Sequence, residues 1–327
     1  MNEITQERIL VTGGAGFIGS FVVEELVRRG LDVVVLDNFR SGKRENLSAV
    51  ANRIKIVEGD IRSLDTLDRV MRGVNTVYHM AVEPLTIGLI DPFLMDSVNS
   101  TGTLNVLYAA RKHKVVRFNY VSSSEVYGSA KYVPMDESHP MDPYTTYAAS
   151  KAAGEAYTRA YHNCYGMDFT LIRPFNAYGP RHRMDSYSAV IFCFLERFLA
   201  GKSPIIYGTG NQTRDLSFVK DSARGIVLAG QSKATLNEAI NIGTGTEVSV
   251  NQIARVMSDA MGKNVTPRHE KERPGDVMRH LADISKATKI LGFKPKYSFE
   301  QGIRETVAWY EDAHKNPTPS SNREKKT

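Results

Sequence analysis

The chain has 327 residues, a formal net charge of +6, 42% hydrophobic and 24% charged residues, a composition typical of soluble globular proteins with a large core. Its two cysteines, Cys164 and Cys193, fit neither a disulfide framework nor a metal-ligand spacing, so we expect no metal. The sequence lacks a signal-peptide pattern, a membrane-spanning apolar run and a basic stripe for nucleic acid. We therefore expect a cytoplasmic protein with neither membrane nor nucleic-acid partners.

Short β-branched runs alternate with helical patterns through the first half of the chain. The expected strands lie at 8–11, 32–36, 55–57, 74–80, 115–121 and 169–173. The expected helices lie at 17–29, 64–72, 95–113 and 147–165, with Gly30 as a cap of the first. This alternation predicts parallel βαβ units and hence an α/β fold with a Rossmann-type doubly wound parallel sheet.

The pattern changes after Pro174. A helix at 190–200 and a strand at 205–207 are followed by two strands, 216–219 and 239–242, which we expect to return to the sheet around helix 221–231. The segments 250–261 and 300–313 complete a smaller C-terminal α+β substrate lobe. The expected division is a cofactor domain over 1–178 and 216–244, a substrate lobe over 179–215 and 245–314, and a flexible tail over 315–327.

Three glycines, Gly13, Gly16 and Gly19, stand between the first expected strand and helix. Glycines at this spacing permit a tight turn and let backbone N–H groups approach a pyrophosphate at the start of a helix. A lone glycine triplet is weak evidence because such turns also serve packing alone. The strand, turn and helix context makes a dinucleotide site the better interpretation.

Asp37 ends the second expected strand, where a carboxylate accepts hydrogen bonds from an adenosine ribose and repels a 2′-phosphate. This favours NAD, although Arg40 and Lys43 leave NADP open. The pair Asp60 and Ile61 follows the third strand and is expected at the adenine edge. At the end of the fourth strand we expect His79 to be a hydrogen-bonded structural residue.

Tyr147 and Lys151 are four residues apart and share one face of their expected helix. Because a tyrosine ordinarily ionises near pH ~10, a neighbouring ammonium and an oxidised nicotinamide are expected to lower its pKa. Ser123, at the end of the fifth strand, is placed to hydrogen-bond a reacting hydroxyl beside Tyr147, whereas Ser122 is expected only to cap the loop. The sequence therefore predicts a tyrosine base acting on an alcohol.

These motifs together resemble the extended short-chain dehydrogenase/reductase family, and within it the nucleotide-sugar epimerases and dehydratases. The resemblance covers roughly residues 8–313 and includes the Gly13-x-x-Gly16-x-x-Gly19 turn, Asp37-Asn38, Gly59-Asp60, Asn99, Ser123, Tyr147/Lys151, Arg173-Pro-Phe-Asn176 and Gln212-Thr-Arg-Asp215. It implies a tightly held NAD and transient oxidation at C4 of a nucleotide-diphosphate sugar. It also implies a homodimer built through helices 95–113 and 147–165.

The resemblance assigns roles residue by residue. Tyr147 is the base, Lys151 its activator and Ser123 the hydroxyl partner. The implied cofactor contacts are Gly13, Gly16, Phe17, Ile18, Gly19, Asp37, Asn38, Asp60, Ile61, Ala81, Asn99, Tyr147, Lys151 and Pro174. The implied substrate contacts are Ser123, Asn176, Arg214, Arg273 and Asp276, and guanidinium groups suit a diphosphate.

Glu125 distinguishes the possible reactions. The dehydratases and uronic-acid decarboxylases resemble this chain in carrying an acid there, whereas simple 4-epimerases usually lack it. A 4-ketone acidifies the C5 proton, and Glu125 is suited to remove that proton while the C6 oxygen leaves as water. The leading expectation is therefore an NAD-dependent 4,6-dehydratase with Glu125 as the C5 base.

Two positions depart from the family pattern. Ser124 stands where some dehydratases carry an aspartic acid, which weakens protonation of the leaving group. Glu83 adds a carboxylate near the expected sugar pocket, or else belongs to a solvated loop. A 4-epimerase is the first alternative. Weaker alternatives are a uronic-acid decarboxylase, with Arg183 or Arg279 on the carboxylate, and a non-catalytic NAD-binding regulator.

Overall fold

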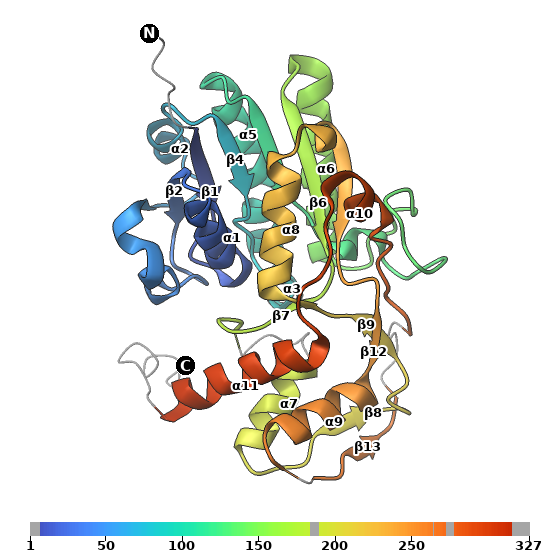
Figure 1. Ribbon diagram of the computed structural model, residues 1–327. Coiled ribbons are helices and arrows are strands. Elements are labelled where there is room, and N and C mark those ends of the chain that lie inside the picture. The colour runs from blue at the N-terminus through green and yellow to red at the C-terminus, as the bar shows by residue number, and fades with distance from the viewer. Residues whose placement is uncertain (1–6, 184–189, 264, 273–277, 316–327) are drawn as a thin grey trace.

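The computed structural model describes residues 7–183, 190–263, 265–272 and 278–315. Its centre is a seven-stranded sheet in the order β11-β6-β5-β4-β1-β2-β3, in which every neighbouring pair is parallel (Figure 1). The strands are β1 (Arg8–Thr12), β2 (Asp32–Asp37), β3 (Ile54–Glu58), β4 (Thr76–His79), β5 (Arg117–Val121), β6 (Asp168–Pro174) and β11 (Glu238–Ile242). The strand order reverses between β1 and β4, where α/β sheets of this kind bind ligands. The predicted Rossmann-type α/β class is confirmed.

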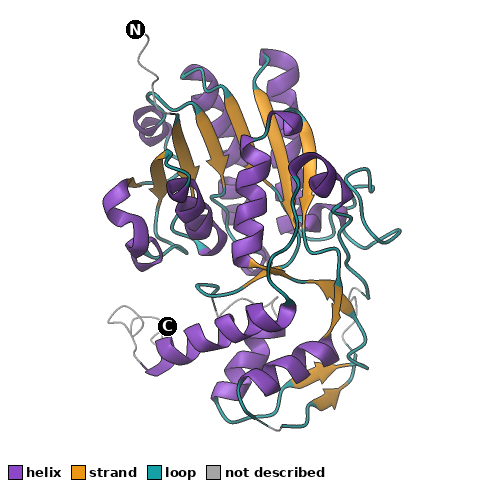
Figure 2. Ribbon diagram, in the orientation of Figure 1, coloured by secondary structure: helices purple, strands orange, loops and turns teal. Residues whose placement is uncertain are grey.

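Helices cover both faces of the sheet, as its buried apolar strands require (Figure 2). Ile9 and Val11 of β1 pack in one core cluster, while Leu10 between them packs in the cluster on the other face. The first face carries α1 (Phe17–Arg28), the 3-10 helix η1 (Arg44–Arg53) and α8 (Val219–Gln231). The second carries α2 (Leu64–Val70) and α5 (Gly102–Lys112), with α6 (Thr146–Tyr165) packed beside α5.

Helix α10 (Ser285–Leu291) packs against β11, whereas most of the remaining elements lie below the carboxyl edge of the sheet (Figure 1). They include the helices α7 (Val190–Leu199), α9 (Val250–Ala260) and α11 (Phe299–Lys315). Three two-stranded sheets accompany them. These sheets pair β7 (Ala177–Tyr178) with β10 (Ser217–Phe218), β9 (Thr213–Asp215) with β12 (Glu247–Ser249), and β8 (Ile205–Tyr207) with β13 (Arg268–Glu270). The predicted domain boundaries stay a prediction.

Two expected elements differ from the structure. The strand expected at 216–219 does not join the main sheet, because β11 occupies the place beside β6 and β10 pairs with β7 instead. The single helix expected at 95–113 is divided into α4 (Pro92–Asp96), a π-helical segment η2 (Ser97–Thr101) and α5. Single π-helical turns inside α-helices often occur at functional sites, and this one contains Asn99.

Within the described residues, no helix has the length and apolar character that a bilayer span requires. The same part of the chain contains no group of three or more His, Cys, Asp or Glu side chains placed to hold a metal ion. Arg273, Asp276 and nearly all of the expected tail lie outside the described residues.

Candidate active site

The glycine turn after β1 brings two backbone segments into close contact. Gly13 has a φ of 70°, and a Cβ placed on it would lie 2.7 Å from the Cα and N atoms of Ala81, just beyond β4. A Cβ on Gly19 would lie 2.2 Å from the carbonyl oxygen of Gly13. Both positions therefore require glycine, because main-chain atoms occupy the space that a side chain would need.

The first turn of α1 leaves its N–H groups without a side-chain cap. Gly16 is the N-cap residue, and the first turn carries no acidic residue. Phe17, Ile18 and Gly19, three of the expected cofactor contacts, form this first turn. Uncapped N–H groups at a helix N-terminus form a binding site for an anion such as a pyrophosphate.

The carboxylate of Asp37 is 6% exposed and organises the loop beside this turn. It accepts hydrogen bonds from the N–H groups of Ala15, at 2.9 Å, and Phe39, at 2.8 Å. Burial raises the pKa of Asp37. Since each carboxylate oxygen accepts more than one hydrogen bond, Asp37 retains the capacity to accept from a ribose hydroxyl.

Asn38 and Asp60 connect the ends of β2 and β3. Asn38 Nδ2 donates a 3.0 Å hydrogen bond to Asp60 Oδ2, and Arg62 pairs with both oxygens of the same carboxylate. The hydrogen bonds from Arg62 lower the pKa of Asp60 to about 2. Asp60 is therefore charged at neutral pH, and Ile61 beside it is buried.

Glu83 is not the solvated loop residue that one interpretation of the sequence allowed, because it is only 4% exposed. Its Oε1 atom lies 3.0 Å from Arg40 Nε. Asn99, in the π-helical segment, donates to the backbone carbonyl of Glu83 and accepts from its N–H group. Arg40, which the sequence left available for a 2′-phosphate, is thus engaged by Glu83.

His79 has the structural role that the sequence predicts. Its Nδ1 atom lies 2.7 Å from Thr12 Oγ1, and its Nε2 atom lies 2.9 Å from Thr103 Oγ1. Burial lowers the pKa of His79 to about 3, so the ring is neutral at physiological pH.

Tyr147 and Lys151 lie near the N-terminus of α6, which Thr145 caps by accepting a hydrogen bond from the Ala148 N–H group. The hydroxyl of Tyr147 is hydrogen-bonded to Ser123. Lys151 is 3% exposed, and its Nζ atom donates a 2.6 Å hydrogen bond to the carbonyl of Val121 at the end of β5. The structure therefore brings together the three residues expected to act on the alcohol.

The effect of the chain on the Tyr147 hydroxyl is opposite to the expected one. Burial raises the pKa of Tyr147 to about 12, and the hydrogen bond from Ser123 offsets this only in part. Burial also lowers the pKa of Lys151 to about 7, and its Nζ atom donates to the carbonyl of Val121. In the protein alone, desolvation outweighs the expected electrostatic activation of the phenol.

The segment after β5 places two adjacent side chains differently. Ser123 has extended backbone, and its hydroxyl accepts a 3.2 Å hydrogen bond from the Glu125 N–H group, which caps the 3-10 helix η3 (Ser124–Tyr127). The capping role expected for Ser122 is therefore wrong, and the Ser122 hydroxyl is buried with no hydrogen-bond partner. Glu125 is half-buried, and burial raises its pKa while Arg214 acts in the opposite direction.

Asn176 and Arg214, the described members of the expected substrate set beyond Ser123, lie on either side of one buried junction. Asn176 Nδ2 donates to the carbonyl of Asp215 at 3.0 Å and lies 3.1 Å from His280 Nδ1. Arg214 acts electrostatically on both Glu125 and His280. Arg214, expected to bind the diphosphate, therefore also affects the charge of Glu125, the expected base at C5.

Comparison with known proteins is consistent with this geometry. The family model for GDP-mannose 4,6 dehydratase matches residues 10–306. The chain belongs to this family. A UDP-glucose 4-epimerase of Mycolicibacterium smegmatis is 35% identical over 93% of this chain and 98% of its own length. A dTDP-glucose 4,6-dehydratase of Streptomyces niveus is 36% identical over 93% of each chain.

A solved structure extends the similarity to three dimensions. The dTDP-glucose 4,6-dehydratase of Streptomyces venezuelae, with NAD and TYD bound, superposes with a TM-score of 0.87 at 34% identity, covering 94% of this chain and 98% of that one. The predicted resemblance to nucleotide-sugar epimerases and dehydratases is confirmed. This member of the GDP-mannose 4,6 dehydratase family is therefore an enzyme of that group.

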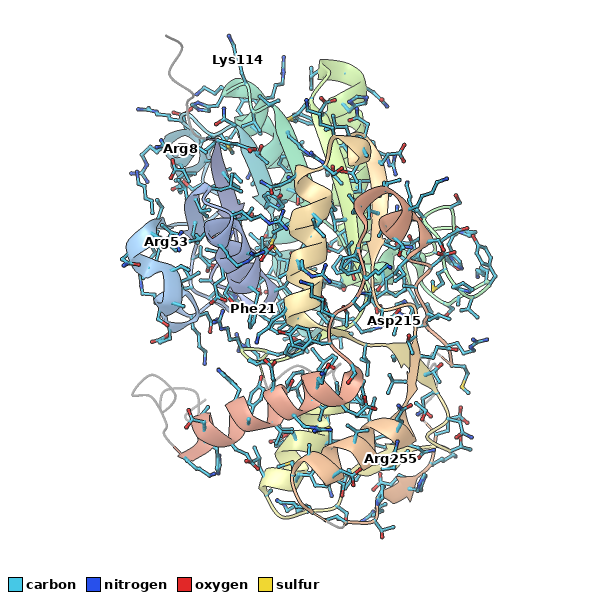
Figure 3. The ribbon with its side chains drawn as sticks, in the orientation of Figure 1. Arg8, Phe21, Arg53, Lys114, Asp215 and Arg255 are labelled. Carbon is cyan, nitrogen blue, oxygen red and sulfur yellow. The ribbon has the colours of Figure 1, made fainter. Side chains whose placement is uncertain are left out.

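The sequence assigned no role to two buried residues of this family member. Asp215 is fully buried where the sheet meets the lower elements (Figure 3), and its carboxylate accepts hydrogen bonds from Thr244 and Gly245. His280 is 4% exposed, and burial lowers its pKa to about 4. Asp215 belongs to the Gln212-Thr-Arg-Asp215 motif, but the burial of both residues could not be predicted because their partners are distant along the chain.

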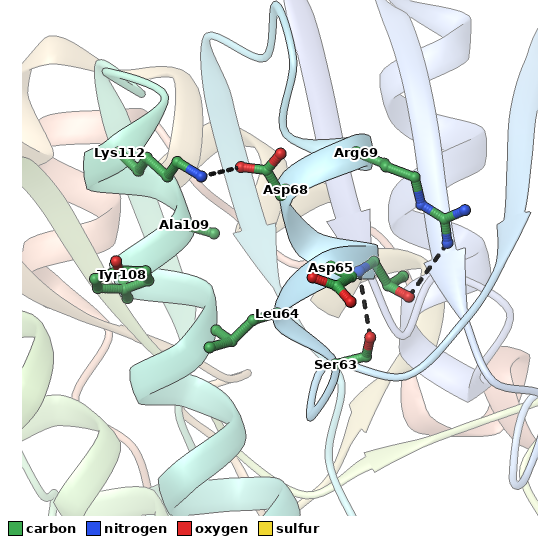
Figure 4. Close-up of a pocket in the computed structure, with 9 residues that line it drawn as sticks. Ser63, Leu64, Asp65, Asp68, Arg69, Tyr108, Ala109 and Lys112 are labelled. Atoms are coloured by element: carbon green, nitrogen blue, oxygen red, sulfur yellow. Dashed lines mark hydrogen bonds and ion pairs between the residues drawn. The ribbon is translucent and has the colours of Figure 1, made fainter.

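A surface hollow of about 710 Å³ lies away from these residues, between α2 and α5 (Figure 4). Its lining is Ser63, Leu64, Asp65, Thr66, Asp68, Arg69, Tyr108, Ala109 and Lys112. The Asp68 carboxylate is already paired with Lys112 and His113. The lining shares no residue with the expected cofactor, catalytic or substrate sets, so the candidate active site is the carboxyl edge of the sheet.

Proposed function

We propose that this enzyme binds NAD across the glycine turn and modifies the sugar of a nucleoside diphosphate sugar through transient oxidation at C4. The leading reaction is 4,6-dehydration, with Glu125 as the base at C5. The observation that carries this choice is a half-buried carboxylate two residues from Ser123, whose side chain is hydrogen-bonded to Tyr147.

The backbone around the glycine turn fits a dinucleotide. The space that a Cβ at Gly13 would fill is bounded by Ala81, and the N–H groups at the start of α1 have no side-chain cap. Asp37 and Asp60 supply acceptors for the adenosine end at the carboxyl ends of β2 and β3. Engagement of Arg40 by Glu83 supports NAD over NADP, since Arg40 was one of the two residues, with Lys43, that left a 2′-phosphate possible.

Bound NAD would supply the acceptor for the hydrogen that leaves C4 of the sugar. Tyr147 Oη would take the proton of the C4 hydroxyl while Ser123 holds that hydroxyl in place. Because burial opposes the phenolate, the positive charge of the oxidised nicotinamide is needed to favour it. Lys151 would hold a cofactor ribose from its position against the end of β5.

Glu125 would act after C4 has become a ketone. Its carboxylate would accept the proton from C5, the electron pair of that C–H bond would form the C5–C6 double bond, and the C6 hydroxyl would leave as water once it is protonated. The leaving C6 oxygen needs a proton, and Ser124, next to Glu125 in the sequence, carries the hydroxyl that would donate it. Return to C6 of the hydrogen taken from C4, with a proton added at C5, would complete the reaction and restore the oxidised cofactor. Arg214 and Asn176 would hold the diphosphate, since a guanidinium pairs bidentately with phosphate oxygens.

The test is to incubate the purified enzyme with UDP-glucose, dTDP-glucose and GDP-mannose and to analyse the products by mass spectrometry and NMR. Dehydration removes the mass of one water. If the enzyme is a dehydratase, Glu125→Gln should still oxidise C4 but should not eliminate water. The absorbance of reduced dinucleotide should then appear on substrate addition and persist. Inversion at C4 with unchanged mass would replace the dehydratase reading with the 4-epimerase alternative.

The 4-epimerase alternative is supported by Ser124, which replaces a proton donor that dehydration uses. In that reaction the ketone presents its other face, so no base at C5 is required. Glu125→Gln would then leave turnover within a few-fold of the wild type. The two reactions therefore predict opposite consequences for one isosteric substitution.

We also propose a homodimer through α5 and α6. Tyr108 and Tyr165 are each 50% exposed, and Tyr157 is 38% exposed. Exposed aromatic side chains of this kind are enriched at protein interfaces. Analytical ultracentrifugation at micromolar concentration should give a dimer, and a monomer alone would contradict this.

A further inference from the structure

The ion pair between Arg40 and Glu83 crosses the strand that carries the glycine turn. Arg40 lies in the loop after β2 and Glu83 in the loop after β4, whereas β1 lies between these two strands in the sheet. Neighbouring strands are about 4.8 Å apart, so the two loops start about 10 Å apart across the end of β1. The contact at 3.0 Å therefore spans the end of the sheet where the pyrophosphate site is expected.

The loop that carries Arg40 packs directly on the glycine turn. The Lys43 N–H group donates a 3.1 Å hydrogen bond to the carbonyl of Ala15. A Cβ on Gly42 would lie 2.9 Å from the carbonyl carbon of Ala15. A dinucleotide that lies along the turn must consequently pass beside this loop to enter or leave.

The two partners of the ion pair differ in solvent exposure and in hydrogen bonding. The Arg40 side chain is 48% exposed, whereas that of Glu83 is 5% exposed and its Oε2 atom is buried without a hydrogen-bond partner. Asn99 holds the backbone of Glu83 through two hydrogen bonds. We therefore call Glu83, whose backbone is held by hydrogen bonds, the anchor, and Arg40, whose side chain is exposed, the arm.

Burial raises the pKa of Glu83, and the charged groups around its carboxylate act in both directions. Besides Arg40, Arg62 and Arg183 act on its carboxylate attractively, and Asp60 opposes them. Asn99 Nδ2 also donates to Ser150 Oγ at 3.0 Å, and Ser150 Oγ donates to the carbonyl of Tyr147. The anchor is therefore connected to the helix that carries the expected base.

We propose that Arg40 and Glu83 form a clasp across the dinucleotide groove, which must open for the cofactor to exchange and so sets the rate of its release. The inference rests on the proposed function, because it requires NAD in the groove. A reaction that returns hydrogen to the sugar regenerates its cofactor on the protein. Slow release is then an advantage, and a clasp that joins an exposed arm to a buried anchor provides it.

The experiment measures exchange rather than turnover. Each purified protein, carrying its bound NAD, is mixed with excess isotopically labelled NAD, and native mass spectrometry follows replacement of the bound nucleotide. The variants are Arg40→Gln, Glu83→Gln, their double mutant and Arg40→Lys. Glu58→Gln is the matched control, because it removes an exposed ion pair with Arg44 on the same side of the sheet.

Arg40→Gln and Glu83→Gln should each speed exchange by about tenfold or more, since either substitution removes the ion pair that joins the two loops, and such changes act mainly on dissociation. The double mutant should be no faster than the faster single variant, Arg40→Lys should be intermediate, and Glu58→Gln should match the wild type. Exchange within twofold of the wild type in both single variants would overturn the clasp. Faster exchange in Arg40→Gln alone would also overturn it, since Arg40 would then bind the nucleotide directly. If no variant and no wild-type protein binds NAD, the proposed function itself fails.

Discussion

Lys151 Nζ donates a 2.6 Å hydrogen bond to the carbonyl oxygen of Val121 and lies 4.5 Å from the centre of the Tyr120 ring. This contact joins the helix of the expected base to the strand that presents Ser123. It also fixes a lysine where water has little access, so its pKa falls to about 7 through burial. The same residue therefore orders the site and opposes the stability of the fold.

Replacement of Lys151 should consequently stabilise the protein in a pH-dependent way. The folded pKa of about 7 is below the ordinary 10.5, so between these values the unfolded chain holds more protons and stability rises with pH. Lys151→Met removes that penalty. We expect it to raise the free energy of unfolding by about 1–2 kcal/mol near neutral pH, with the gain declining toward pH ~10.

Urea titrations of both proteins at about pH 6 and about pH 9 check this expectation. His79 and His280 also make stability rise with pH up to about pH 7, because their folded pKa values of about 3 and about 4 lie below the ordinary 6.5. The test therefore uses the difference between the two proteins and not the pH profile of either one. A difference between the two proteins that is equal at both pH values would contradict the argument.

Tyr147→Phe should remove the proton acceptor without disturbing the fold. The variant loses only the hydroxyl that is hydrogen-bonded to Ser123. General-base catalysis contributes about 10²–10⁴-fold, so we expect turnover to fall by that factor while NAD stays bound. Steady-state kinetics and the nucleotide content of the purified variant test both halves. Turnover near the wild-type value would show that another group accepts the proton.

Glu125 should determine the acidic limb of the pH profile if dehydration is the reaction. Burial raises its pKa above the ordinary 4.5, and a base must be deprotonated to act. Turnover should therefore fall as the pH drops through that raised value, at a higher pH than an exposed glutamate would give. Glu125→Gln should abolish this limb together with water loss. A limb that persists in the glutamine variant would assign it to another group.

The sequence predicts those parts of the fold and the site that depend on neighbours along the chain. Alternating strand and helix patterns, the glycine turn and the four-residue spacing of Tyr147 and Lys151 are local features, and the observed sheet and helix α6 agree with them. The pairing of strand β10 was predicted wrongly, because the strand has only two residues and pairs with β7, a segment about 40 residues earlier.

Burial and hydrogen-bond partners are the other features that local patterns do not contain. The orientation of Lys151 toward Val121 depends on how α6 packs against β5, and the burial that raises the pKa of Tyr147 comes from the same packing. The sequence allows Glu83 to be either a solvated loop residue or a buried one, because its contacts with Asn99 and Arg40 exist only in the folded chain. Both features depend on groups that meet only in the folded chain.

Gly13→Ala should cost more stability than a glycine substitution elsewhere. Gly13 and Gly30 both have positive φ, at 70° and 80°, but a Cβ on Gly30 meets no atom within 4 Å. Gly30→Ala should therefore lose only about 1–2 kcal/mol from backbone strain, whereas Gly13→Ala must also displace Ala81. Urea titration should give a loss that is larger by at least ~1 kcal/mol, together with weakened NAD binding. Equal losses in the two variants would remove the close approach at Gly13 as an explanation.

The ion pair between Arg173 and Glu155 provides a stability test independent of the cofactor. Arg173 Nε and Nη2 donate to the two carboxylate oxygens at 2.8 and 2.6 Å, and each side chain is 2% exposed. Loss of one partner leaves a buried charge unpaired, so Glu155→Gln and Arg173→Met should each cost roughly 3–5 kcal/mol.

The double variant Arg173→Met/Glu155→Leu should cost much less than the sum of the single variants, because neither charge is then buried alone. Lys220 and Glu305 form the matched control, since their 2.6 Å ion pair has side chains 41% and 40% exposed. Glu305→Gln should change stability by less than about 1 kcal/mol. Additive losses in the Arg173 and Glu155 variants would show that Tyr127, which also hydrogen-bonds Arg173, stabilises the guanidinium without the carboxylate.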